Sequence, residues 1–119
     1  LVSDNKTLAH PDSVDSIPSS ANQEDHVSMG ANAARHALEI VANVRHILAI
    51  ELLTAAQAVD LRPDGPARLG AGTRAVYHVI RQYARFLEHD RELTPEIETL
   101  AALIQSGQLL DAVQDLELA

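Results

Sequence analysis

The sequence has no cysteine and no tryptophan, and its aromatic residues are two tyrosines and one phenylalanine. Without cysteine, the chain has neither a disulfide framework nor a thiolate site, which is compatible with a reducing cytoplasm. Because 46% of the residues are hydrophobic and only 3% are aromatic, the core must be aliphatic and rich in alanine. Such a composition suits closely packed helices better than a sheet. We therefore expect an all-α fold.

Positive charge is also scarce. Nine Lys and Arg residues against seventeen Asp and Glu give a formal net charge of -8 at pH 7. Because such a chain repels a polyanionic backbone, nucleic acid is excluded as an expected partner. The sequence shows no signal-peptide pattern and no apolar run long enough to span a bilayer, so we expect no membrane partner and a cytoplasmic location.

The length and the first residue indicate a piece of a longer protein. At 119 residues, the chain is long enough for a modest core but short for an enzyme that must enclose a substrate by itself. It begins with Leu1 and not with Met. We expect the remainder of the polypeptide to lie N-terminal to this segment.

Apolar periodicity and turn signals divide the chain into three parts. Residues 1–19 carry two prolines and no helical or strand period, and they predict an extended lead-in. Residues 20–61 predict one long central helix, because no Pro or Gly interrupts an apolar stripe between Ala31 and Leu61. Residues 62–119 predict a C-terminal helical segment, with helices at about 73–89, 95–106 and 109–116.

The central helix has a clear predicted start. Ser20 and Gln23 have the spacing of a capping box, in which each side chain bonds the backbone amide of the other residue. A helix of about 40 residues would be roughly 60 Å long and apolar around much of its circumference. Because a domain of this size cannot cover such a helix, we expect neighbouring segments or subunits to bury the rest.

Glu24 is the candidate for chemistry in this chain. In the first turn of the predicted helix, a carboxylate is stabilised by the helix dipole, so spacing alone favours a solvated structural acid. If Glu24 instead faces a closed cavity, loss of hydration favours its protonated form and makes it suitable for proton transfer. The residue pattern by itself leaves both readings open.

No metal site is expected. His26, His36 and His46 are ten residues apart, and on a helix each is rotated by about 80° from the last, so they cannot meet at one ion. The remaining histidines lack the spacing of a helical zinc site.

The stretch around Glu24 resembles the corresponding segment of histidine ammonia-lyases. The likeness is strongest over residues 14–30 (VDSIPSSANQEDHVSMG) and covers nearly the whole chain, weakening toward the C-terminus. The further matching segments are residues 5–11 (NKTLAHP), 48–53 (LAIELL), 55–58 (AAQA) and 69–74 (LGAGTR).

The resemblance implies the C-terminal part of a larger helix-bundle enzyme, a homotetramer that converts L-histidine to trans-urocanate and ammonia. In this family Glu24 would bind the imidazole of the substrate or act as a general base. Related phenylalanine and tyrosine lyases usually have Gln at this position. A glutamate at position 24 therefore favours L-histidine as the substrate.

The family uses an electrophilic methylidene-imidazolone made from an internal Ala-Ser-Gly, a tripeptide that this chain lacks. The resemblance thus implies that the N-terminal remainder of the enzyme supplies the cofactor and that the chain alone is inactive. Two alternatives stay open: a non-catalytic helical oligomerisation module derived from the lyase tail, and a lyase or aminomutase for tyrosine or phenylalanine.

Overall fold

The computed structural model describes residues 1–14, 17–24, 27–114 and 116. Within these ranges the regular structure is helical, and the one isolated backbone bridge joins Ser19 and Glu24. The predicted all-α fold with one long helix is therefore confirmed, and the described residues contain four shorter α-helices where two or three are predicted. The chain forms two compact units, Leu1–Val44 and Arg45–Ala119, which are described separately below.

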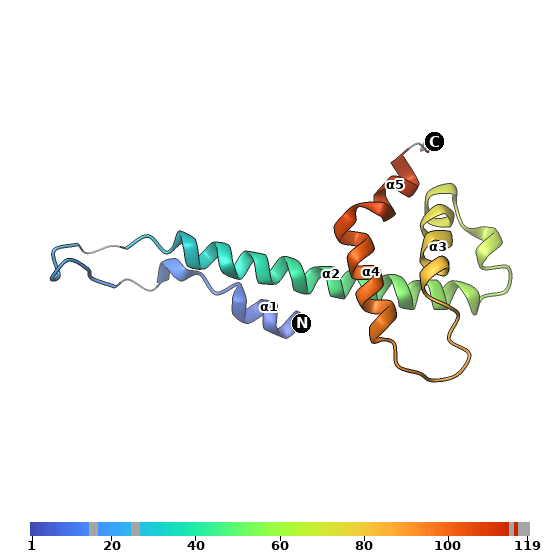
Figure 1. Cartoon of the computed structure of the whole chain (residues 1–119), viewed down its shortest axis with the longest axis horizontal. Helices are drawn as coiled ribbons and strands as arrows, with labels where there is room; N and C mark the ends of the chain where they lie inside the picture. Colours follow the sequence, from blue (N-terminus) through green and yellow to red (C-terminus); the bar gives the residue numbers. More distant parts are fainter. Residues whose placement is uncertain (15–16, 25–26, 115, 117–119) are drawn as a thin grey trace. The chain divides into compact units, whose positions relative to one another are not determined.

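The first unit packs short helical turns against the first half of the long helix (Figure 1). The side-chain amide Nδ2 of Asn43 donates to Asn5 Oδ1 at 2.8 Å, which holds the short N-terminal helix against the long one. The prediction of an extended lead-in over residues 1–19 is wrong at Val2–Leu8 and Asp12–Val14, where tertiary contacts support helical turns that have no periodicity of their own. The elements are α1 (Val2–Leu8), the 3-10 helix η1 (Asp12–Val14) and the first half of α2 (Gly30–Asp60).

The long helix α2 begins ten residues later than predicted, at Gly30 instead of Ser20. Its first backbone bond runs from the Ala33 amide to the Met29 carbonyl at 3.0 Å. The predicted end is close to the observed one, because Pro63 disfavours helical geometry at the residue before it. Helix α2 still has 31 residues, so the single long helix is observed.

The turn after α2 is closed by a close approach of two backbone segments. A Cβ atom at Gly65 would lie 1.9 Å from the carbonyl oxygen of Val59, which is far inside van der Waals contact. The Gly65 amide donates to the Arg62 carbonyl at 3.0 Å. Glycine is required here by space, since its φ of -50° is open to any residue.

The second unit builds its core from the second half of α2 and the helices that follow it. The elements are η2 (Pro66–Arg68), α3 (Ala71–Tyr83), α4 (Thr94–Ser106) and α5 (Gln108–Gln114). The buried side chains are mostly small or aliphatic, as the composition predicts. They are Ala49, Leu53, Ala56, Ile80, Ala84, Leu100, Ala101 and Leu103.

Helix α3 ends at Tyr83, six residues before its predicted end near position 89. Ala84 is extended and fully buried. Beyond it, the side chain of Gln57 bonds both the amide and the carbonyl of Leu87, at 2.9 and 3.1 Å. These two hydrogen bonds hold Leu87 outside a helix, although the sequence pattern up to position 89 favours one. Helix α4 closes as predicted, with Gly107 in the left-handed region at φ 84°.

A polar cluster ties the end of α2 to α3. Asp60 accepts a hydrogen bond from the Tyr77 hydroxyl. It also forms an ion pair with Arg81 at 2.5 Å, and both charged side chains are mostly buried. Arg81 also donates to the Ala84 carbonyl at 2.9 Å. The hydrogen bond to Asp60 raises the pKa of the Tyr77 hydroxyl above its ordinary value of 10.0, because an ionised tyrosine cannot donate.

The connection between α3 and α4 is held by Arg91. Its guanidinium donates to Glu96 Oε1 at 2.8 and 3.1 Å and to the Arg85 carbonyl at 3.2 Å. Glu96 lies in the first turn of α4. The hydrogen bonds from Arg91 lower the pKa of the Glu96 carboxyl below its ordinary value of 4.5.

Replacing Arg91 by Gln is expected to destabilise the chain by about 1 kcal/mol or less at neutral pH, since the pair is partly exposed. Because the folded pKa of Glu96 is depressed, the pair contributes fully above the ordinary value of 4.5 and is lost as pH falls through the depressed pKa. The destabilisation should therefore shrink on acidification. Urea unfolding between about pH 7 and pH 3, followed by circular dichroism, measures this change. Arg35→Gln, on the exposed face of α2, is the matched control. An equal effect of Arg91→Gln at all pH values would contradict the assignment.

Candidate functional site

Glu24 lies at the end of a tight reversal of the chain and not in a helix. The backbones of Ser19 and Glu24 pair in both directions, with N–O distances of 3.1 and 3.2 Å. The Gln23 amide donates to the Ser20 carbonyl at 3.2 Å. The residues inside the reversal have positive φ angles of 51°, 56° and 65°, at Ser20, Ala21 and Asn22. The predicted capping box is therefore wrong, because Ser20 is left-handed and begins no helix.

The side chain of Glu24 is exposed, and its described partner is Ser19, whose hydroxyl donates to Glu24 Oε2 at 2.9 Å. A carboxylate can accept about four hydrogen bonds, so most of its capacity remains open to another group. The described residues of this chain form no closed cavity around Glu24. The desolvated environment that proton transfer requires would have to come from other parts of the protein.

The hollow nearest to this reversal in the sequence lies between the segments that lead into and out of it. It measures about 650 Å³. Its lining is mixed, with the polar side chains of Asp12, Ser13 and Ser28 beside apolar ones. The remaining lining residues are Pro11, Val27, Met29, Gly30 and Ala33.

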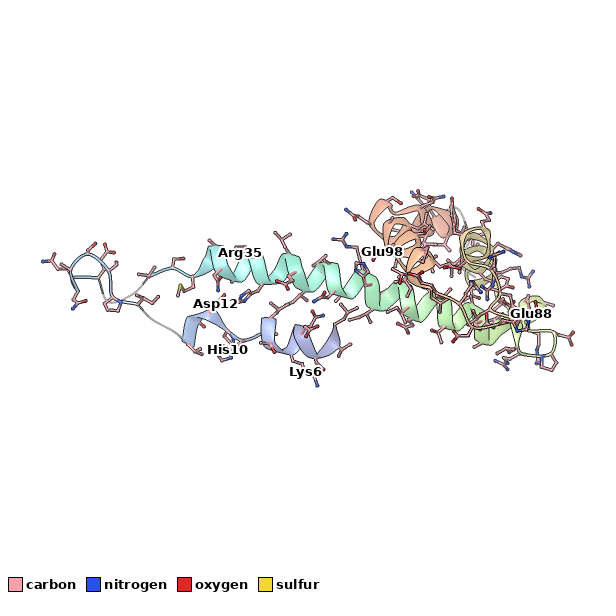
Figure 2. All side chains as sticks on the ribbon, turned by 60° about the horizontal axis from the view of Figure 1, so that its bottom comes forward. Lys6, His10, Asp12, Arg35, Glu88 and Glu98 are labelled. Atoms are coloured by element: carbon pink, nitrogen blue, oxygen red, sulfur yellow. The ribbon has the colours of Figure 1, made fainter. Side chains whose placement is uncertain are left out.

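Sequence reasoning missed a polar cluster beside this hollow. Asn32 donates to Asp12 Oδ1 at 2.6 Å, and His36 Nδ1 lies 3.8 Å from Asp12 Oδ2. Figure 2 shows Asp12 on η1, next to the first turns of α2. The partners are twenty or more residues apart, so no local spacing signals the cluster.

Of the three histidines spaced ten residues apart, the two that the structure describes, His36 and His46, have different acidic neighbours. His36 is near Asp12, whereas His46 Nε2 lies 3.2 Å from Glu98 in the second unit. His26 lies outside the described residues. Among the residues that the structure describes, no group of three or more His, Cys, Asp or Glu side chains is arranged to hold a metal ion.

The second unit carries a groove of a different kind. It has a volume of about 310 Å³ and lies between α2, α3 and α5, with Leu52, Val76 and Val113 in its lining. Apart from Thr73 and the Tyr77 hydroxyl, the lining side chains are apolar. Such a groove offers a packing surface but few groups that could orient a polar substrate. In the described parts of the chain, no helix combines the length and the apolar character needed to cross a membrane.

Comparison with known proteins places these features in a family. The family model "Aromatic amino acid lyase" matches residues 1–82, which include Glu24 and all of α2. The chain is 60% identical over 114 residues to the histidine ammonia-lyase of Symbiobacterium thermophilum and 55% identical over 114 residues to that of Natranaerobius thermophilus. Each alignment covers 96% of this chain and 22% of the relative, so the chain spans about a fifth of the length of these proteins.

Solved structures agree with the sequence relatives. The histidine ammonia-lyase from Trypanosoma cruzi superposes with a TM-score of 0.84 at 43% identity, covering 95% of this chain and 22% of that one. The tyrosine aminomutase from Streptomyces globisporus superposes with a TM-score of 0.85 at 37% identity, covering 99% of this chain and 23% of that one. The resemblance predicted from the sequence is confirmed, and the chain belongs to the aromatic amino acid lyase family.

Proposed function

We propose that this chain is the C-terminal part of a histidine ammonia-lyase, which eliminates ammonia from L-histidine to give trans-urocanate. The observation that carries the proposal is the high identity, 60% and 55%, to relatives named histidine ammonia-lyase. The residue type at position 24 supports the same substrate, because the resemblance implies Gln here in phenylalanine and tyrosine lyases.

Glu24 would contribute a carboxylate to an active site that other parts of the enzyme complete. The elimination must remove a weakly acidic β-proton from the substrate, and a carboxylate within reach can accept this proton. The same carboxylate can instead bind the substrate imidazole by a hydrogen bond. Both roles suit an exposed carboxylate that keeps most of its hydrogen-bonding capacity.

The methylidene-imidazolone of the family would come from the remainder of the polypeptide. This group makes the amino group of the substrate a better leaving group. The one Ser-Gly pair of this chain, Ser106–Gly107, follows Gln105 and forms the C-terminal cap of α4, so it does not fit the precursor. The role of this chain would be to present Glu24 and to supply helices to the shared bundle.

We further expect a cytoplasmic homotetramer. The first half of α2 exposes apolar side chains along its length, and such a stripe favours association with other helices. They include Leu38, Val41 and Val44. This stripe is also the observation that favours the second candidate function, a non-catalytic oligomerisation module.

The test is turnover of L-histidine by the full-length enzyme, followed by the absorbance of urocanate, with L-tyrosine and L-phenylalanine as competing substrates. We expect urocanate from histidine and no product from the other two amino acids. The 119-residue chain alone should be inactive, and mixing it with the N-terminal remainder should restore activity. A preference for tyrosine would replace this proposal with the aminomutase alternative. A full-length polypeptide without Ala-Ser-Gly and without turnover would support the oligomerisation module.

A further inference from the structure

The segment that carries Glu24 is tied together at its base. Asp12 lies twelve residues before Glu24, and Asn32 lies eight residues after it. The hydrogen bond of 2.6 Å between their side chains therefore joins the start and the end of the segment that contains the reversal. Joining the two ends reduces the number of conformations open to the intervening residues.

The burial of Asp12 makes loss of its hydrogen bond to Asn32 energetically costly. The Asp12 side chain is only 14% exposed. On the side of His36, its neighbours around a second hollow are mostly apolar, and they include Leu8, Ala37 and Ile40. A carboxylate in such a place needs its polar partners, because an unpaired charge away from water is costly. His36 Nδ1 is itself buried and lies 3.8 Å from Asp12 Oδ2, which is too far for a hydrogen bond, so the bond to Asn32 is the described polar contact that holds Asp12.

We propose that Asp12 is a positioning residue for Glu24. By holding η1 against the first turns of α2, Asp12 fixes the two ends of the segment that carries Glu24 and thus restricts where the Glu24 carboxylate can lie. This inference rests on the proposed function, in which Glu24 meets the substrate. The hydrogen bond from Asn43 to Asn5 joins α2 to α1, not to η1, and therefore cannot substitute for it.

The test is a double-mutant cycle in the full-length enzyme with Asp12→Ala, Glu24→Gln and the combined variant. Asp12→Ala should lower kcat/KM for L-histidine on the order of 10- to 100-fold, because a misplacement of about 1 Å can cost this much. In the Glu24→Gln background, the same change should have little further effect, since the group that it positions is already gone. Equal losses in both backgrounds would overturn the proposal and leave Asp12 with a structural role only.

Three further variants separate positioning from unfolding. Asp12→Asn keeps an oxygen that accepts from Asn32 and should restore most of the activity. Asn32→Ala removes the same hydrogen bond from the other side and should reproduce the loss, also if Asp12→Ala fails to fold. Glu39→Gln removes an exposed carboxylate from α2 and should behave like the wild type. A loss of the same size in Glu39→Gln would contradict the specific role of Asp12.

The same measurements distinguish a wrong substrate from a wrong positioning role for Asp12. If the wild-type enzyme turns over tyrosine in place of histidine, the proposed substrate is wrong, and the cycle run with tyrosine still tests Asp12. If the wild type turns over histidine but Asp12→Ala matches Glu39→Gln, the positioning role alone is overturned.

Discussion

Replacing Glu24 by Gln in the full-length enzyme is expected to lower kcat/KM for L-histidine on the order of 10²- to 10⁴-fold, the range that a positioned acid or base contributes. Gln keeps the size and a hydrogen-bonding oxygen, but it cannot accept a proton at neutral pH. The measurement is the initial rate of urocanate formation over a range of histidine concentrations.

The two proposed roles of Glu24 differ in which constant changes. If Glu24 removes the β-proton, kcat falls and KM changes little; if it binds the imidazole equally in the ground and transition states, KM rises and kcat changes little. Glu88→Gln is the matched control, because Glu88 is exposed in the connection after α3 (Figure 2). Near-normal turnover by Glu24→Gln would remove Glu24 from the active site.

Replacing Leu100 by Ala is expected to cost about 2–5 kcal/mol of unfolding free energy. Leu100 is fully buried and belongs to the core of the second unit. The change removes apolar contacts and leaves a cavity that Ala49, Leu53 and the other core residues fill only in part. Urea unfolding of the 119-residue chain, followed by its helical circular dichroism, gives the difference directly.

Leu110→Ala is the control for this prediction. It is the same chemical change on α5, at a side chain that is 71% exposed, and it should alter stability by less than about 0.5 kcal/mol. A similar loss in both variants would show that the chain has no cooperative core around Leu100.

Helix ends that depend on covalent geometry could be predicted from the sequence. Pro63 stops α2 and Pro95 starts α4, because the proline ring restricts its own φ and the residue before it. Gly107 closes α4 because the left-handed region is open to glycine at little cost. Each of these effects acts within one or two residues, so a linear sequence contains all the information that it needs.

Features that depend on distant partners could not be predicted. Residues 20–23 match a capping box, yet the pairing of Ser19 with Glu24 places the first of them in a left-handed turn. Beyond the early end of α3, Leu87 is bonded by Gln57, which is thirty residues away in the sequence. The active-site role of Glu24 is implied by the resemblance to a family and not by local spacing. Asp12 carries no local signal, because its partner Asn32 is twenty residues away.

Three consecutive left-handed residues precede Glu24, and this has an energetic consequence for anything that binds there. For an L-amino acid the left-handed conformation costs roughly 1–2 kcal/mol per residue, and such residues usually occur singly. Ala21 has no polar side chain to offset this cost, whereas Asn22 does. The reversal therefore holds its shape against its own local preferences. Because the paired backbones of Ser19 and Glu24 hold this shape without a ligand, its cost is borne by folding, and a ligand that meets the carboxylate finds it already preorganised.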